Sequence, residues 1–145
     1  MLGFFENNRI ESDESHVRNL ILMAKSDNSM DKSELEVIFK IGKERGFDRE
    51  EVRDFIKDDK RTGLIKPDTV LEKYEQLHDL VLVMLADGII EEDEMEFIVD
   101  FGNKLGFRKV TAAFAVTYIL EGIEQDMSQR QIYNRIKKIL TLKYD

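Results

Sequence analysis

The chain has 145 residues, of which 30 are acidic and 22 basic, so its formal net charge is −8 at pH 7. A domain of this length can bury a sizeable core, whereas an acidic surface repels nucleic acid and anionic lipid. Because the chain contains no cysteine, disulfides, thiolate zinc sites and thiol nucleophiles are excluded. We expect a single domain over residues 1–145 and no nucleic-acid partner.

Helix is the favoured state throughout, because the chain contains one proline and few runs of β-branched residues. Residues 1–10 lack the basic region and apolar core of a secretion signal. The longest apolar run, residues 80–86, is far shorter than the roughly 20 residues that a membrane-spanning helix needs. The sequence thus predicts an all-α, cytoplasmic protein with no direct membrane insertion.

The first helix is predicted from apolar residues at helical spacing, which are Val17, Leu20, Ile21 and Ala24. After a polar break, Asp31 and Glu34 have the spacing of a capping box, which predicts the start of a second helix. Gly46 indicates where that helix ends, and Gly42 within it indicates close packing against a neighbouring helix. A third helix is expected to follow from Asp48.

The chain contains an internal repeat, since residues 16–47 align without a gap with residues 76–107 at an offset of 60. The identical pairs include glycines, acidic residues and apolar residues of the predicted helices. They are Leu20/Leu80, Leu22/Leu82, Asp27/Asp87, Glu34/Glu94, Glu36/Glu96, Ile38/Ile98, Gly42/Gly102, Gly46/Gly106 and Phe47/Phe107. The repeat predicts two related helix–loop–helix halves, joined near residues 58–66, within a bundle of about seven helices.

The second half differs from the first in residues 80–85, which are apolar all round, so their helix is expected at the buried centre. A further helix is predicted from about Lys109. Its inward residues are expected to be Ala112, Ala113, Val116 and Ile119 or Leu120. The last helix is predicted to start at Ser128, and its basic stripe is expected to be solvated.

One segment of the second half combines the end of an apolar helix, the tripeptide Ala86-Asp87-Gly88 and an acidic helix start that reaches Glu94. Together with Ile98 and residues 105–107, this segment resembles the central signature of the TerB-like tellurite-resistance family. The resemblance covers nearly the whole chain, because that family's fold is a duplicated helical bundle. It implies a cytoplasmic role in bacterial stress or tellurite resistance, and metal-ion binding by an acidic cluster.

The resemblance places the family's acidic positions on Asp87 and Glu94, and the internal repeat extends them to Asp27 and Glu34. The first half departs from the pattern, because Asn28 stands where the signature has its glycine. Any functional site is therefore expected beside Asp87 and Glu94 first.

The acidic residues around the two turns have two interpretations. In the first, Asp27 and Asp87 accept hydrogen bonds from the free N–H groups of the helix that follows each of them. In the second, carboxylates bind a divalent cation such as Mg²⁺, Ca²⁺ or Mn²⁺. The ligands of that site would be Asp87, Glu91, Glu94, Asp27, Asp31 and Glu34. A calcium loop of the EF-hand type is excluded, because Val83 and Leu85 occupy its first and third ligand positions.

Glu75 and His78 have the Glu-x-x-His spacing of di-iron bundles, but the apolar face of their helix leaves Glu75 outside and His78 at its edge. A surface pair is therefore expected. The sequence contains no phosphate-binding glycine loop, nucleophile elbow or metalloprotease histidine pair. It predicts a non-enzymatic TerB-like binding or scaffold module that acts through protein contacts, with a homodimer left open. A divalent metal-ion sensor or buffer and a carboxylate-metal enzyme are the alternatives.

Overall fold

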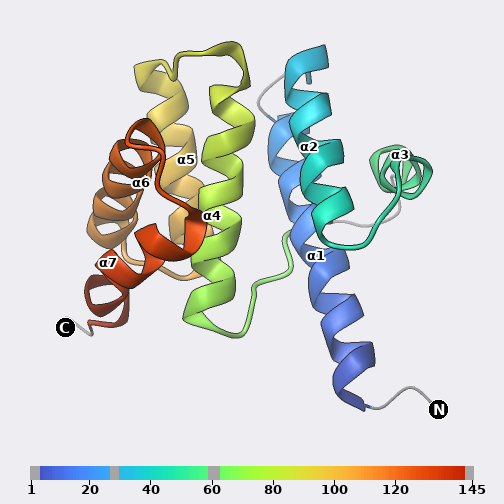
Figure 1. The fold of residues 1–145 in the computed structure, drawn as a ribbon, viewed down its shortest axis with the longest axis horizontal. Coiled ribbons are helices and arrows are strands. Elements are labelled where there is room, and N and C mark those ends of the chain that lie inside the picture. Colours follow the sequence, from blue (N-terminus) through green and yellow to red (C-terminus); the bar gives the residue numbers. More distant parts are fainter. Residues whose placement is uncertain (1–3, 27–29, 59–62, 143–145) are drawn as a thin grey trace. The chain divides into compact units, whose positions relative to one another are not determined.

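The computed structural model describes residues 4–26, 30–58 and 63–142, and within the first helix it describes side chains from residue 9 onward. Over these residues the chain forms seven α-helices and one short 3-10 helix and no strand, which confirms the all-α prediction (Figure 1). None of the described helices is both long and apolar enough to cross a membrane. The chain divides into two compact units, Met1–Ile65 and Lys66–Asp145. A single domain over residues 1–145 stays a prediction.

Unit 1 (Met1–Ile65) consists of three helices that pack against one another, α1 (Phe4–Ser26), α2 (Lys32–Glu44) and α3 (Arg49–Lys57). The helix α2 begins with the predicted capping box. Asp31 Oδ1 accepts a hydrogen bond from the Glu34 N–H at 2.8 Å, and Glu34 Oε1 accepts one from the Asp31 N–H at 3.2 Å. These bonds satisfy donors that a helix start otherwise leaves without partners.

Unit 2 (Lys66–Asp145) contains α4 (Val70–Met84), the 3-10 helix η1 (Leu85–Asp87), α5 (Glu92–Leu105), α6 (Lys109–Glu124) and α7 (Gln129–Thr141). The helix α4 packs against α5, α6 and α7 (Figure 1). Leu80, Val81, Val83 and Met84 are buried, which confirms that this apolar helix is central. The contacts with three helices explain why it needs more than one apolar face.

One residue of α6 lies on the opposite face from the predicted one. Ala113 is exposed, whereas Ala112, Ala115, Val116 and Ile119 are buried. The predicted inward position of Ala113 is therefore wrong. An alanine between apolar neighbours does not mark the helix face by itself, and the helical period puts Ala115 on the buried side.

A connection that we call a glycine joint links α2 to α3. Gly42 lies against the following helix, because an added Cβ would lie 2.6 Å from Val52 Cγ2, closer than side-chain atoms normally approach. Gly46, at a φ of 96°, then reverses the chain, and the Phe47 N–H donates to the Gly42 carbonyl at 2.8 Å. Asp48 caps the next helix. Both glycines therefore have a steric reason, close approach at one and a left-handed backbone at the other.

A second glycine joint links α5 to α6, as the repeat predicts. An added Cβ at Gly102 would lie 2.7 Å from Ala112 Cβ. Gly106 has a φ of 119°, and the Phe107 N–H donates to the Gly102 carbonyl at 3.1 Å. The close packing predicted for Gly42 and Gly102 is thus confirmed in both units.

A third glycine joint links α6 to α7, outside the repeated segments. An added Cβ at Gly122 would lie 2.6 Å from Ile132 Cδ1. The Met127 N–H donates to the Gly122 carbonyl at 2.8 Å, and Ser128 caps α7 as predicted. Asp126 takes the place of the reversing glycine, with a φ of 59°. The helix α6 therefore takes part in two joints.

Asp126 is the one non-glycine residue with positive φ in the described part of the chain. Because a side chain in this conformation is strained and glycine is not, Asp126→Gly is expected to raise the free energy of unfolding by about 0.5–1 kcal/mol. Urea denaturation followed by circular dichroism would measure the change. Asp126→Ala should lower stability, since alanine lacks the local hydrogen bonding that helps aspartate adopt this conformation. A less stable glycine variant would contradict the strain.

Candidate functional site

The acidic residues predicted as a site in unit 2 surround the turn between α4 and α5. Asp87 is exposed at the end of η1, and Gly88 follows with a φ of 102°. Glu91 is the N-cap residue of α5, and its N–H donates to Glu94 Oε1 at 3.0 Å. The structure thus brings Glu91 and Glu94 together at the helix start, where negative charge is favourable. Capping of α5 by Asp87 stays a prediction.

In unit 1 the structure joins Asp31 and Glu34 in the capping box of α2, whereas Asp27 lies outside the described residues. Asp31 Oδ1 also accepts a hydrogen bond from Ser33 Oγ at 2.8 Å. Helix capping therefore accounts for the positions of these two carboxylates without a metal ion. Binding of a divalent cation by the six predicted carboxylates stays a prediction.

His78 is buried, so the predicted surface pair with Glu75 is wrong. The His78 side chain is 7% exposed, and its Nδ1 lies 3.2 Å from Asp79 Oδ1. Gln129 at the start of α7 places its Nε2 3.2 Å from both of these atoms. A single buried face of α4 would leave His78 at its edge, whereas the packing of α4 against α5, α6 and α7 covers that edge.

Tyr74 extends this buried polar group by one helical turn. Its side chain is fully buried, and its hydroxyl donates to the Gln129 carbonyl at 2.8 Å. We call Tyr74, His78, Asp79 and Gln129 the α4–α7 polar cluster. It fixes the start of α7 against the central helix through one backbone and two side-chain contacts.

Unit 1 has a matching anchor on α1, at the residue that the repeat aligns with Asp79. Asn19 is buried, and its Nδ2 donates to the Ile65 carbonyl at 2.7 Å. The Ile65 N–H donates back to Asn19 Oδ1 at 3.1 Å. In both units a polar residue of the first helix thus holds the segment that follows the third helix. The sequence carried a signal for this, because polar residues interrupt the apolar face at matched positions of both copies.

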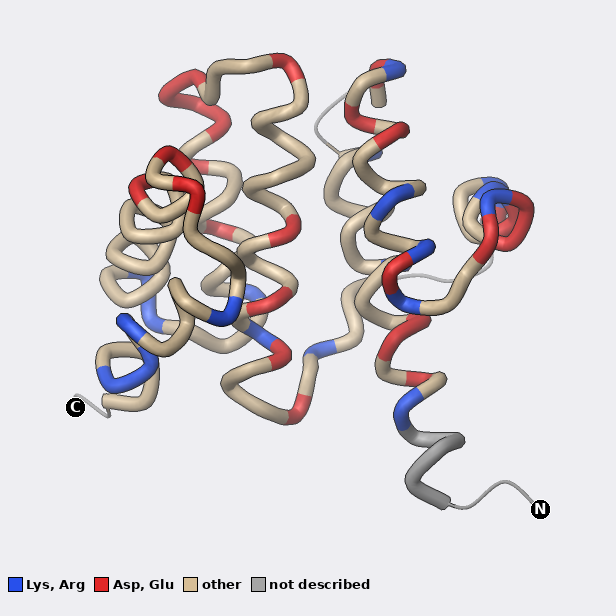
Figure 2. Tube along the Cα trace, in the orientation of Figure 1, with Lys and Arg blue, Asp and Glu red and all other residues tan. Residues whose placement is uncertain are grey.

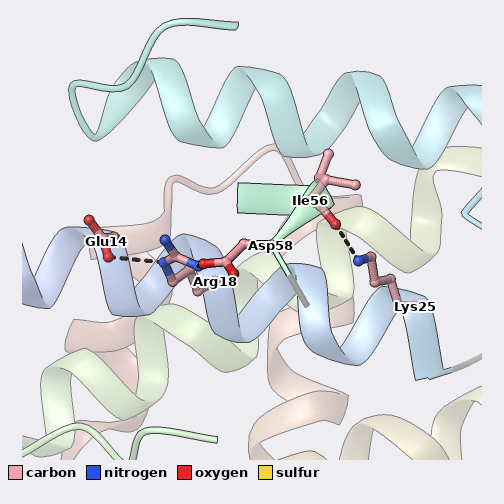
Figure 3. Close-up of polar contacts among 5 residues, drawn as sticks. All are labelled: Glu14, Arg18, Lys25, Ile56 and Asp58. Carbon is pink, nitrogen blue, oxygen red and sulfur yellow. Dashed lines mark hydrogen bonds and ion pairs between the residues drawn. The ribbon is translucent and has the colours of Figure 1, made fainter. Parts of the chain in front are cut away.

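The end of α3 is held by two basic residues of α1 (Figure 3). Arg18 donates to Glu14 Oε2 at 2.9 Å and to Asp58 Oδ2 at 3.0 Å, and its guanidinium lies 4.5 Å from the centroid of the Phe55 ring. Lys25 Nζ donates to the Ile56 carbonyl. A cation is favourable at a helix C-terminus, where carbonyl groups lack intrahelical partners. These residues therefore have a structural role in unit 1.

Arg18→Ala is expected to lower the free energy of unfolding by about 1–2 kcal/mol, because two charge-assisted hydrogen bonds and a ring contact are lost at a half-buried position. Urea denaturation would measure this, with Arg9→Ala, an exposed change on the same helix, as the control. Equal stability of the two variants would contradict the anchoring role.

The outward side of α6 carries two neighbouring large apolar side chains, which no other helix does over the residues whose side chains are described. Val110 and Phe114 are both 53% exposed and lie one helical turn apart. Ala113 and Thr117 are exposed beside them. We call these four residues the α6 outer face. Neighbouring exposed apolar side chains on a helix are typical of contact surfaces, whereas single ones are not.

No family model, curated protein or solved structure matches the chain. The resemblance to the TerB-like family rests on the segment around Asp87 and on the internal repeat. It therefore stays a prediction from the sequence.

Proposed function

We propose that the chain is a non-enzymatic, TerB-like binding module that acts through protein contacts in a bacterial stress response of the tellurite-resistance type. The observation that supports this best is the α6 outer face. It leaves Val110 and Phe114 half exposed on a helix whose other side already packs in the core of unit 2. A partner that covers this face would remove apolar surface from water, which is the main driving force of protein association.

A quantitative affinity pull-down from the host would test this proposal. The bait is the full chain, compared with a Val110→Ser, Phe114→Ser variant and with Asn134→Ser, a change at an exposed polar residue of α7. The wild type and the Asn134 variant should retain the same partner, and the double variant should lose it while keeping its melting temperature. Binding of the purified partner would then be measured directly. Equal retention by all three baits would contradict the proposal.

A divalent metal-ion sensor or buffer is the second candidate. It is favoured by the recurrence of acidic helix starts at positions that the repeat aligns, with Asp31 and Glu34 in one copy and Glu91 and Glu94 in the other. A cation that binds the folded state should raise the stability by about 2.7 kcal/mol at 100 times its dissociation constant.

Thermal unfolding with Mg²⁺, Ca²⁺, Mn²⁺ or Zn²⁺ would test metal binding. We expect a saturable rise in melting temperature that is absent from an Asp87→Asn, Glu94→Gln variant. No rise, or an equal rise in the variant, would contradict a specific site.

A further inference from the structure

The surface between α2 and α3 in unit 1 corresponds to the surface between α5 and α6 in unit 2, but different side chains cover the two. In unit 1 the surface between α2 and α3 is covered by arginines of α3. The Arg49 guanidinium lies 4.0 Å from the centroid of the Phe39 ring, and that of Arg53 lies 5.6 Å from it. Arg49 also forms a bidentate ion pair with Glu36 and lowers the pKa of that carboxyl. The Arg49 guanidinium therefore contacts both the Phe39 ring and the Glu36 carboxylate and covers this surface.

In unit 2 the repeat offset places other residues at these positions. Glu96, Val99, Lys109 and Ala113 replace Glu36, Phe39, Arg49 and Arg53. The equivalence extends through the glycine joints, since Val52 and Ala112 face Gly42 and Gly102 in the same way. The carboxylate is kept, whereas the ring and both guanidinium groups are lost, since a lysine replaces the first arginine and an alanine the second.

The result is an open groove between α5 and α6, with a volume of about 430 Å³. Its lining consists of Glu92, Met95, Glu96, Val99, Asp100 and Lys109. Lys109 Nζ lies 3.4 Å from Asp100 Oδ1, so the lysine pairs with a different carboxylate from the one that Arg49 selects in unit 1. Met95 and Val99 are half-buried and form the apolar floor.

The charges along this groove follow one side of α5. Glu92, Glu96 and Asp100 are exposed and spaced four residues apart, so they form a stripe beside the Met95 and Val99 floor. Their counterparts in α2 are Lys32, Glu36 and Lys40, which makes the open groove more acidic than the filled one. The colours along the trace in Figure 2 show the acidic residues at the start of α5 in red and the basic residues of α7 in blue.

We propose that the groove between α5 and α6 binds an arginine-bearing amphipathic helix of a partner protein, whose guanidinium groups take the positions that Arg49 and Arg53 occupy in unit 1. An acidic stripe beside an apolar one is complementary to a helix with basic and apolar residues on adjacent rows. Arginine is favoured over lysine, because its planar group stacks on the floor and pairs with a carboxylate through two N–H groups. This inference rests on the proposed function and adds the chemistry of the partner.

The probe is a synthetic, lactam-stapled helix of 15 residues with arginine at every fourth position and leucine on the adjacent row. It is titrated into the ¹⁵N-labelled full chain, with a version that carries glutamate in place of arginine as the control. Chemical-shift changes should concentrate on α5 and the start of α6 with the arginine peptide alone. A Glu96→Gln, Asp100→Asn variant should weaken this binding by about tenfold or more, through loss of two charged partners.

A variant that fills its own groove gives an independent readout. Val99→Phe with Ala113→Arg restores the ring and one of the two guanidinium groups of unit 1, so it should block the peptide while its melting temperature stays equal or rises. Asn134→Arg adds the same charge at an exposed position of α7, outside the groove and outside the α6 outer face, and should leave peptide binding unchanged. Normal binding by the filled variant would overturn the proposal, as would shifts spread evenly over both units or equal affinity in the Glu96, Asp100 variant.

Two further results would distinguish a partner helix from a second copy of this chain, and a failure of this inference from a failure of the proposed function. A dimer that forms with rising concentration in sedimentation equilibrium, and that Glu96→Gln with Asp100→Asn disrupts, would overturn the partner helix in favour of a second copy. If the groove does not bind the arginine peptide but capture of the partner still depends on Val110 and Phe114, this inference is overturned and the proposed function stands.

Discussion

Tyr74→Ala is expected to lower the free energy of unfolding of unit 2 by about 3–5 kcal/mol, the usual cost of removing a fully buried aromatic ring. Tyr74 is 0% exposed, its ring centroid lies 5.1 Å from that of Tyr133, and its hydroxyl donates to the Gln129 carbonyl. Tyr74→Phe keeps the ring and removes one buried hydrogen bond, so it should cost about 1 kcal/mol. Urea denaturation would give both values, and hydrogen exchange would locate them in unit 2.

Tyr118 is a suitable control, because it is a partly exposed tyrosine of the same unit. Tyr118→Ala should cost clearly less than Tyr74→Ala. Similar losses at the two positions would contradict the central place of Tyr74 in the α4–α7 polar cluster.

The hydroxyl of Tyr74 also predicts a dependence on pH. Burial, with the nearby charges of Asp79 and Glu75, raises the pKa of Tyr74 well above its usual value. A raised pKa in the folded state means that the neutral form is favoured by folding. Its contribution is therefore complete below the unfolded pKa of about 10 and is lost as the pH rises above that value. Tyr74→Phe should show a smaller fall in stability between about pH 9 and pH 11 than the wild type.

Gly122→Ala is expected to destabilise unit 2 by about 1–3 kcal/mol, because the added Cβ would overpack the contact with Ile132. Helix propensity alone predicts the opposite sign, a gain of about 1 kcal/mol for alanine over glycine. The sign of the change therefore decides whether the third glycine joint is as close as the structure shows. Thermal and urea unfolding would measure it, with Glu121→Ala on the exposed side of α6 as the control.

A double-mutant cycle separates this contact from a general effect on α6. Ile132→Ala removes the side chain that the new Cβ would meet, so Gly122→Ala should cost much less in that background. Additive losses would show that Gly122 and Ile132 are not coupled, in contradiction to the joint.

The internal repeat allowed much of the fold to be predicted, because its identical residues are the ones with structural roles. Gly42 and Gly46 recur as Gly102 and Gly106, and the capping residue Glu34 recurs as Glu94. The third joint escaped prediction for a physical reason. Only Gly122 keeps its type, while an aspartate adopts the left-handed conformation and Met127 replaces the phenylalanine.

The buried polar residues were predicted less well than the apolar ones. A single helical face places His78 at an edge, but α4 is covered by three helices, and Gln129 supplies a partner from a distant part of the chain. Burial of a polar side chain depends on such a partner, which periodicity does not contain. The helix starts in which Glu34 and Glu94 take part were predicted, because capping depends only on neighbours in sequence.

The α6 side of the groove lies beyond the aligned segments, which end at Phe47 and Phe107. Its residues Lys109 and Ala113 correspond to Arg49 and Arg53 of unit 1. This correspondence follows from the glycine joints, which show that α3 and α6 are equivalent helices. The groove arises from residues that differ between the two copies, whereas the repeat is recognised from the residues that they share.

The last turn of the third helix determines how many helices each half contains. In unit 2 that helix, α6, ends in a glycine joint, which gives the chain a reversal and the next helix a surface to lie on. In unit 1 the end of α3 is instead closed by Arg18 and Lys25 of α1, and the chain leaves it in an extended conformation at Asp58. A scaffold of this kind could be lengthened or shortened by a helix at a time through a few substitutions at one helix end, with the existing core left as it is.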